Sequence, residues 1–297
     1  MPKYSIISMK KTYIIVLAVL NFNILIPNQR SFAFIPSVYE PNTKELKVTG
    51  LSIGDMAAKF IRFGPIKQGT NLAKLAVSLN PEKVELWIIL AEGQMKTNQL
   101  EDALLSIQKA KSYNSSLANI WFAEASIALN LKKPKYAITS LESGLKIDPN
   151  NPTAYFQLGN AKFILNKTNS ALKAFQKASE LKPNFWQAIN NQGLVHYEMN
   201  NIKKAIYLWR KVLGITNDAE PKLALAAALN SIHINNEESI KLAKEALNLN
   251  PNYVSQIHQK EQLWGNKLQE ATKELFKSPK LATSIAKALA NSNFQNK

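Results

Sequence analysis

The sequence predicts an all-α fold, a solenoid of six helix pairs with a C-terminal capping helix. Three observations predict it: prolines recur with one fixed period, small residues occupy fixed places between them, and bulky residues occupy other fixed places. Hydrophobic residues make up 46% of the 297 residues, which is enough to bury a large core. The chain is therefore expected to fold rather than to stay disordered.

The segment 1–33 is predicted to be a secretory signal. Lys3, Lys10 and Lys11 precede an apolar stretch from Thr12 to Ile26, and Ser31-Phe32-Ala33 follows with small residues at the two positions that a signal peptidase inspects. The stretch is shorter than the roughly 18 apolar residues of a helix that spans a membrane. Cleavage after Ala33 is expected, and retention of the segment as a membrane anchor is the alternative.

A repeat with a period of about 34 residues organises the middle of the chain. The interval from Pro149 to Pro183 is one such period, and the intervals from Pro81 to Pro149 and from Pro183 to Pro251 are two periods each. With each proline at position 32 of a unit, six units follow without a gap: 50–83, 84–117, 118–151, 152–185, 186–219 and 220–253. A fixed period of this length is typical of stacked supersecondary units.

Small and large residues keep fixed positions in this frame, although the prolines do not require it. Positions 8, 20 and 27 hold glycine, alanine or serine in every unit except the fifth, where position 27 is Val212. Small residues let two antiparallel helices approach closely, and large ones fill the space between pairs. Each unit is therefore predicted to be a helical hairpin that must stack to bury its apolar face. Position 4 is large throughout, with Ile53, Trp87, Trp121, Tyr155, Ile189 and Leu223.

The frame resembles the tetratricopeptide repeat, whose pattern is a large residue at position 4, Leu at 7, Gly or Ala at 8, Ala at 20, Phe at 24, Ala at 27 and Pro at 32. The unit at residues 152–185 matches this pattern closely, and the resemblance covers roughly residues 50–253. It implies a right-handed α-solenoid. The first and sixth units depart from the pattern with Ala73 and Ala243 at position 24, as terminal repeats commonly do.

The segments that flank the repeats are predicted from local pattern. Residues 34–49 contain two prolines and show no helical period, so they are expected to form an extended lead-in. Residues 254–290 are expected to form C-terminal capping helices that cover the last repeat, because apolar residues from Ile257 to Leu275 continue at helical spacing. The Asn-rich tail at residues 291–297 is expected to fray.

No catalytic, cofactor-binding or metal-binding constellation is visible in the sequence. His196, His233 and His258 lie far apart without metal-ligand spacing, and the chain has no cysteine. The four aspartates include no carboxylate pair that the repeat would bring together, and no phosphate-binding loop or nucleophile elbow occurs. The chain is therefore predicted not to be an enzyme and to need neither cofactor nor metal.

The resemblance implies a binding surface on the first helices of the units. In the family, positions 2, 5, 9, 12 and 13 point into a concave groove. An apolar and aromatic stripe edged by amides suits an extended or helical peptide. The alternative is that the aromatic side chains pack against their neighbours inside the array. The predicted groove residues are Ile88, Met95, Asn119, Phe122, Leu129, Phe156, Asn160, Phe163, Asn190 and Tyr197.

The net charge of +16 indicates an anionic partner only weakly. It is almost entirely lysine, because the chain has three arginines, and so the forked side chain that reads phosphates and base edges is nearly absent. Nucleic acid is therefore not expected as a partner. The lysines on the predicted second helices are expected to be solvated, with peripheral contact to an anionic membrane as the alternative: Lys109, Lys173, Lys177, Lys203, Lys204, Lys211, Lys241 and Lys244.

The sequence favours an exported, monomeric scaffold or assembly factor that holds a protein or peptide partner. Position 5 is never the lysine that family members use to grip acidic chaperone C-termini, which argues against a co-chaperone role. Export would place the chain in a periplasm, or in a thylakoid lumen if the source is photosynthetic. Two alternatives stay open: a membrane-associated structural or assembly protein held by an uncleaved signal, for example in photosynthetic complexes, and a carrier or regulator of polyanions.

Overall fold

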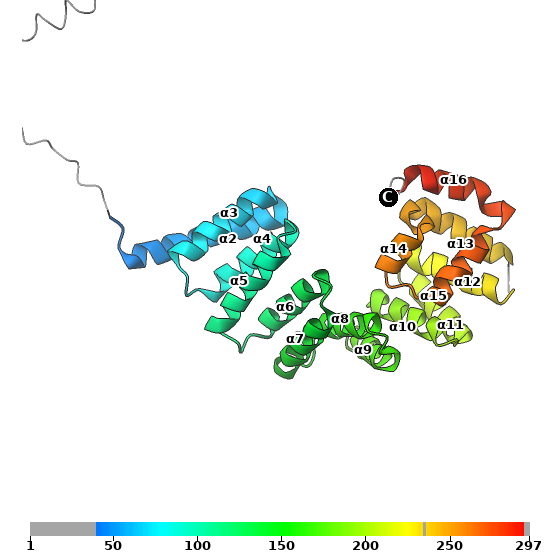
Figure 1. Cartoon of the computed structure of the whole chain (residues 1–297), viewed down its shortest axis with the longest axis horizontal. Coiled ribbons are helices and arrows are strands. Elements are labelled where there is room, and N and C mark those ends of the chain that lie inside the picture. The colour runs from blue at the N-terminus through cyan, green and yellow to red at the C-terminus, as the bar shows by residue number, and fades with distance from the viewer. Residues whose placement is uncertain (1–39, 234–235, 294–297) are drawn as a thin grey trace, which may run out of the picture. The chain divides into compact units, whose positions relative to one another are not determined.

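The computed structural model describes residues 40–233 and 236–293, so the signal predicted at residues 1–33 lies outside the described part. Within these residues, the regular elements are all helices. The predicted solenoid of six helix pairs is confirmed (Figure 1). The pairs are α2 (Thr43–Phe63) with α3 (Ile66–Leu79), α4 (Val84–Lys96) with α5 (Leu100–Tyr113), α6 (Ala118–Asn130) with α7 (Pro134–Ile147), α8 (Pro152–Ile164) with α9 (Thr168–Leu181), α10 (Trp186–Glu198) with α11 (Ile202–Leu213), and α12 (Ala219–Ser231) with α13 (Asn236–Leu249).

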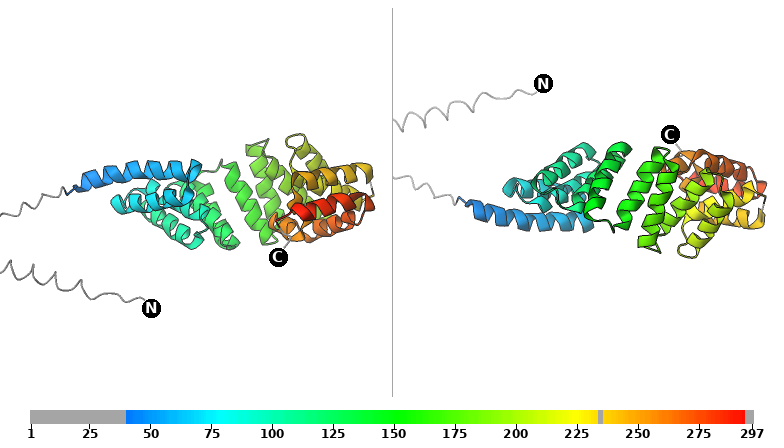
Figure 2. Two further views of the ribbon diagram at one scale, coloured as in Figure 1. Left: turned by 90° about the horizontal axis from the view of Figure 1, so that it is seen from above. Right: turned by 90° about the horizontal axis from the view of Figure 1, so that it is seen from below.

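Each pair packs on the next one along the chain. The second helix of one pair contacts the first helix of the following pair from α3 and α4 through to α11 and α12, and Figure 2 shows the same succession from two sides. Two tryptophans at position 4 also join consecutive units by hydrogen bonds. The indole N–H of Trp87 donates to the carbonyl of Pro81 at 2.7 Å, and that of Trp121 donates to the carbonyl of Ser115 at 2.8 Å.

The small residues of the frame lie where helices touch. All the residues at positions 8, 20 and 27 are buried, including Val212. The cause is visible at two glycines of position 8. A Cβ on Gly159 would lie 2.4 Å from the Phe175 ring, and a Cβ on Gly193 would lie 2.6 Å from the Trp209 ring, so the large residue at position 24 fills the space that the glycine leaves.

The predicted extended lead-in is wrong for residues 43–49, because α2 begins at Thr43. Asn42 caps the helix: its Oδ1 accepts from the backbone N–H of Glu45 at 3.1 Å, while the Glu45 carboxylate accepts from the backbone N–H of Asn42 at 2.9 Å. This reciprocal pair satisfies two backbone donors that a helix start otherwise leaves open. The first helix is therefore longer than the repeat frame allows.

The helices of the C-terminal segment (residues 251–291) have two roles, whereas the sequence predicted only that they cap the last repeat. It comprises η1 (Pro251–Val254), α14 (Gln256–Glu261), α15 (Asn266–Phe276), η2 (Pro279–Leu281) and α16 (Ala282–Asn291). Helix α16 packs against α13 and η1 and caps the last pair, whereas α15 packs against α12 and α10, the first helices of two pairs. The residues predicted to cap the last repeat therefore lie partly over the face predicted to bind a partner.

The apolar residues from Ile257 to Leu275 do not lie on one helix, because the chain turns between α14 and α15. Leu263 has φ 64°, and the backbone N–H groups of Leu263 and Trp264 donate to the carbonyls of Lys260 and Gln259 at 3.0 Å each. These bonds end α14 in the manner of a left-handed C-terminal cap. Gly265 is then the N-cap residue of α15.

Candidate functional site

The predicted groove residues of α4 and α6 are partly exposed and partly packed. Ile88, Met95, Phe122 and Leu129 are half-buried against the core clusters of their units, and Asn119 is exposed. Phe122 also packs within its own hairpin, against Gly144 at position 27 of the unit. A Cβ on Gly144 would lie 2.5 Å from Cε1 of the Phe122 ring. The four half-buried side chains therefore pack against the array on one side and remain accessible to solvent, and so to a partner, on the other.

Helix α8 carries the middle of the predicted groove. The Phe156 ring lies 5.9 Å from the Phe175 ring and 5.1 Å from the Phe185 ring, centroid to centroid, in tilted arrangements. Phe163 packs beside the same Phe175 and Val195. Both phenylalanines stay half-buried, so Phe175, which is fully buried, supports them from behind. Tilted aromatic pairs of this kind hold ring positions more firmly than area burial alone.

Two predicted groove residues on α10 are not open to a partner. Asn190 is 1% exposed and Tyr197 is 4% exposed. Tyr197 belongs to the buried cluster that also contains Trp209, Leu268 and Leu275, so α15 covers it. The prediction that these two residues line an open groove is wrong. Helix α15, outside the repeat frame, fills the face beside Tyr197, whereas the Asn190 amide is engaged by Asn191 and Glu220.

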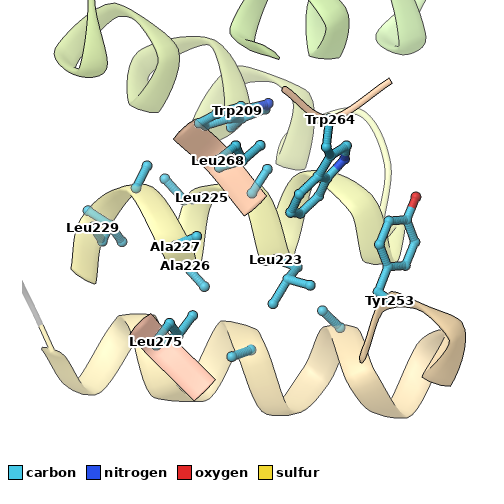
Figure 3. Close-up of a cluster of buried hydrophobic side chains, with 14 of the residues drawn as sticks. Trp209, Leu223, Leu225, Ala226, Ala227, Leu229, Tyr253, Trp264, Leu268 and Leu275 are labelled. Atoms are coloured by element: carbon cyan, nitrogen blue, oxygen red, sulfur yellow. The ribbon is translucent and has the colours of Figure 1, made fainter. Parts of the chain in front are cut away.

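Figure 3 shows how α15 enters this cluster. Leu268 lies between Trp209 and the helix that carries Leu225, and Trp264 lies beside Tyr253 with ring centroids 5.7 Å apart. Leu268, Leu275 and Trp264 are each 2% exposed or less. Burial of three large apolar side chains stabilises the docked segment by several kcal/mol, at about 1.5–3 kcal/mol each.

Glu198, at groove position 13 of the fifth unit, holds the start of α15. Its carboxylate accepts from the backbone N–H groups of Leu268 at 3.1 Å and Lys267 at 3.4 Å, and the Lys267 ammonium donates to its backbone carbonyl at 2.8 Å. Its side chain lies so close to Gly265 that a Cβ there would be 2.1 Å from Cδ. A carboxylate at a helix N-terminus accepts hydrogen bonds from backbone N–H groups that have no partner within the helix, and its negative charge interacts favourably with the helix dipole. Position 13 is a groove position of the repeat pattern, but Glu198 was not among the predicted groove residues.

Amide and hydroxyl side chains join the first helices across the groove face. Gln157 of α8 donates to the Ser126 hydroxyl of α6 at 2.7 Å, and Asn191 of α10 donates to Asn160 Oδ1 of α8 at 2.9 Å. In the repeat frame both bonds run from position 6 of one unit to position 9 of the unit before it. They hold neighbouring first helices in register and leave Asn160 only partly free for a partner.

The C-terminal segment borders two partly open cavities together with α8 and α10. The acidic cavity has a volume of about 710 Å³ and contains Phe156 and Asn160 in its lining, whereas the Phe163 cavity has about 700 Å³ and includes Phe163 and Glu198. Leu263 and Glu261 line both cavities, so the end of α14 lies between them. The structure thus brings three predicted groove residues, Phe156, Asn160 and Phe163, to two partly open cavities.

The acidic cavity takes its name from Asp218, Glu220 and Glu261. Its described lining includes no lysine or arginine. No carboxylate pair could be predicted from the repeat, because Glu261 comes from outside the repeat and reaches the cavity only through the turn of the C-terminal segment. The lining is otherwise rich in amides, with Asn160, Gln187, Asn191, Asn217, Asn250 and Gln262.

Glu220 has a strongly shifted pKa in this cavity. Burial raises its pKa well above the ordinary glutamate value, to about 7, and the charge of Asp218 raises it too, while hydrogen bonds from Trp264, Asn190 and Tyr253 act in the opposite direction. The Trp264 indole N–H donates to Glu220 Oε1 at 3.1 Å. Burial also raises the pKa of Tyr253, with the charges of Glu220 and Asp218 adding to the effect.

Three other features bear on the sequence predictions: possible metal ligands, possible membrane-spanning helices and the lysines of the second helices. Across residues 40–233 and 236–293, no three His, Cys, Asp or Glu side chains gather in a way that could hold a metal ion. In the same part of the chain, no helix has the length and apolar character needed to cross a bilayer. The eight lysines predicted on second helices are all exposed.

Two family models match the chain. The model described as tetratricopeptide repeat matches residues 118–151 and 152–185, which are the bounds of the third and fourth predicted units. The model described as the Rapsyn N-terminal myristoylation and linker region matches residues 186–254. No curated protein sequence matched the chain.

Several solved structures share the fold at low sequence identity. PilF of Pseudomonas aeruginosa is 16% identical with a TM-score of 0.61, over 74% of this chain and 98% of that one. MamA is 22% identical with a TM-score of 0.52, over 58% and 92%. YrrB, described as a TPR protein with an unusual peptide-binding site, is 22% identical with a TM-score of 0.50, over 64% and 97%. These likenesses concern the helical array and leave the side chains of the groove to be argued from this chain.

Proposed function

Since the chain is a tetratricopeptide repeat protein, we propose that it is a scaffold that holds a segment of a partner protein against the first helices α4, α6 and α8. Proteins of this fold generally act by binding and not by catalysis, and the absence of a catalytic constellation in the sequence agrees with this. The proposal therefore assigns neither a reaction nor a cofactor to the chain.

The observation that carries the proposal is the placement of Phe156 and Phe163. Each is half-buried, each is supported by the fully buried Phe175, and each lines a cavity of about 700 Å³ or more on the first-helix face. Aromatic side chains that are fixed from behind and open in front are the usual anchors of peptide recognition, because little conformational entropy is lost when they bind.

Because α15 covers the first helices of the fifth and sixth pairs, we assign the partner to the second, third and fourth pairs and to the cavities at the edge of the C-terminal segment. The neighbouring structure YrrB, described as having an unusual peptide-binding site, offers a precedent for peptide binding by this fold. An extended or helical peptide is the kind of segment that such an apolar face with amide edges accommodates.

The test is affinity capture from native membranes, with the captured proteins identified by mass spectrometry. We expect the variant F156A/F163A to lose partners that the unaltered chain retains, because the two anchors are gone. Tyr207→Ala is the matched control, since Tyr207 lies 60% exposed on α11, a second helix. Retention of every partner by a correctly folded F156A/F163A chain, checked by circular dichroism, would reject the groove as the binding face.

Export is a second part of the proposal and rests on residues 1–33 alone. The lysines ahead of a short apolar stretch and the small residues before Phe34 support a cleaved signal. N-terminal sequencing of the mature protein tests it: a chain that begins at Phe34 supports export without an anchor. A chain that keeps these residues and sediments with membranes supports the membrane-associated alternative, in which the exposed lysines of the second helices contact anionic lipid.

A further inference from the structure

The acidic cavity differs in charge from the rest of this basic protein. The chain carries a net charge of +16, yet the described lining of the cavity holds three carboxylates and no lysine or arginine. Its volume of about 710 Å³ falls within the range of about 300–1,000 Å³ that ligand sites occupy. Clustered carboxylates with low-dielectric walls attract a positive group more strongly than the same carboxylates do in open solvent.

The carboxylates at the base of the cavity are held at fixed places. Asp218 Oδ1 accepts from the backbone N–H of Glu220 at 3.0 Å at the start of α12, and Glu220 Oε1 accepts from the Trp264 indole at 3.1 Å. Glu261, at the end of α14, lines the cavity with a side chain that is 57% exposed. The cavity therefore has two positioned acids at its base and one exposed acid at its rim.

A buried amide oxygen beside these acids has no donor. Asn190 is 1% exposed, its Nδ2 donates to Asn191 Oδ1 at 3.2 Å, and its side chain also hydrogen-bonds Glu220. Asn191 and Glu220 both line the cavity. Its Oδ1 accepts no hydrogen bond from any described residue. A buried acceptor left open costs about 1–3 kcal/mol. Asn190 does not itself line the cavity, and it is linked to the cavity through Asn191 and Glu220.

The walls are suited to a cation in a second way. Phe156, Trp186 and Tyr253 line the cavity and bring aromatic rings near the carboxylates. The faces of aromatic rings attract ammonium and guanidinium groups, and this attraction is stronger where the cation is removed from water. Carboxylates, amide oxygens and ring faces all favour the same kind of ligand.

We propose that the acidic cavity binds the charged side chain of a lysine or arginine in the partner segment. This inference rests on the proposed function, because it places one residue of the partner whose segment lies against α8. The charged head would contact Asp218, Glu220 and Glu261, and the apolar stem would lie against Phe156 and Trp186. The site would select a basic residue at one position of the segment.

The test titrates the full chain with Nα-acetyl-lysine N-methylamide and with the norleucine analogue, which has the same stem and no charge. The indole signal of Trp264, one of five tryptophans, serves as a local reporter in ¹⁵N-resolved NMR because its N–H donates to Glu220. We expect a saturable shift of this signal with the lysine probe and none with the norleucine probe. Equal responses to both probes, or no saturable shift with the lysine probe, would overturn the proposal.

Variants separate the cavity from the general charge of the protein. Glu220→Gln and Glu261→Gln should each weaken the lysine probe by about fivefold or more, while Glu101→Gln, an exposed acid on α5, should leave it unchanged. Equal weakening by all three variants would overturn the assignment, as would a failure of Glu220→Gln and Glu261→Gln to weaken binding.

A third probe, spermidine, distinguishes a free polyamine from a side chain. Binding of spermidine about tenfold more tightly than the lysine probe would assign the cavity to polyamines and overturn the partner-segment proposal. Since these probes bind without any partner, the cavity proposal can fail while capture through Phe156 and Phe163 persists. Retention of capture by the phenylalanine variants would instead reject the proposed function, whatever the probes do.

Discussion

The carboxylate of Glu198 on α10 accepts a hydrogen bond from the backbone N–H of Leu268 in the first turn of α15, at 3.1 Å. The two residues are 70 positions apart, and the bond fixes the C-terminal segment to the first-helix face. The segment is held by a polar contact at its start and by Leu268 and Leu275 along its length.

Replacement of Glu198 by alanine should loosen α15 without unfolding the array. The loss of a carboxylate cap at a helix N-terminus costs about 1 kcal/mol, which corresponds to roughly fivefold faster opening. Hydrogen exchange measured on residues 266–276 should therefore speed up by about fivefold, while exchange in α6 and α7 stays unchanged. Glu101→Ala on α5 is the control. Unchanged exchange in α15 would mean that apolar burial alone fixes the segment.

The glycines at position 8 should resist even a single added methyl group. A Cβ at Gly159 would lie 2.4 Å from Phe175 Cε1, and the Phe175 ring is fully buried and cannot move away freely. Gly159→Ala should therefore lower the free energy of unfolding by about 1–3 kcal/mol, as overpacked cores do. Gly214→Ala is the milder comparison, because its added Cβ would lie 3.3 Å from the Lys211 carbonyl oxygen at the exposed end of α11 and would meet no buried ring. Equal stability of the two variants in urea unfolding would contradict the packing argument.

The repeat part of the fold could be predicted from the sequence because its information is local and periodic. The fixed places of Gly159 and Phe175 within one unit already imply two helices in contact, and four first helices begin at the first residue of a predicted unit: α4, α6, α8 and α10. The extra turns at the start of α2 were missed because the Asn42 and Glu45 cap lies in a stretch with no helical period.

The candidate site could be predicted only in part. Phe156, Asn160 and Phe163 followed from frame positions and do line cavities. The burial of Tyr197 depends on α15. The docking of α15 rests on contacts such as that between Glu198 and Leu268, which the repeat period does not predict. The carboxylates of the acidic cavity were missed for the same reason, since one of them arrives from outside the repeat.

Stability should depend on pH through Glu220. Its pKa is raised to about 7 in the folded chain, so the folded state binds the proton more tightly than the unfolded state does. This group contributes stability that is fully present below the ordinary glutamate pKa and is lost as the pH rises through about 7, by up to roughly 3 kcal/mol. The facing groups are Asp218, Asn190, Tyr253 and Trp264, and Glu261 and His258 line the same cavity.

Glu220→Gln isolates this effect, because glutamine keeps an acceptor for the Trp264 indole and does not titrate. As the pH rises from about 5 to about 8, the unaltered chain should lose stability relative to the Gln variant in urea unfolding. The histidines oppose the trend in both chains, since burial lowers the pKa of His196 and of His258. A constant difference between the two chains across this range would show that Glu220 titrates normally.

Glu124 occupies position 7 of the third unit, where the repeat pattern has leucine, and it is 0% exposed. Its carboxylate accepts from the Lys111 ammonium and the Tyr136 hydroxyl at 2.5 Å each, and from the Ser140 hydroxyl at 2.8 Å. The Lys111 ammonium also lies 4.3 Å from the centroid of the Trp121 ring. These contacts compensate the loss of hydration that burial imposes on the carboxylate.

Glu124→Ala should destabilise the chain by about 3–5 kcal/mol, because it leaves a lysine and two hydroxyl groups without their acceptor and opens a cavity. Glu124→Gln should cost less, since it keeps an acceptor and loses only the charge. The double variant K111M/E124L should return to within about 1 kcal/mol of the unaltered chain, because apolar residues of similar size often replace a buried ion pair without loss. Urea unfolding measures all three. If the double variant is as unstable as Glu124→Ala, the ion pair contributes more than a leucine could at this position, and the departure from the repeat pattern is itself stabilising.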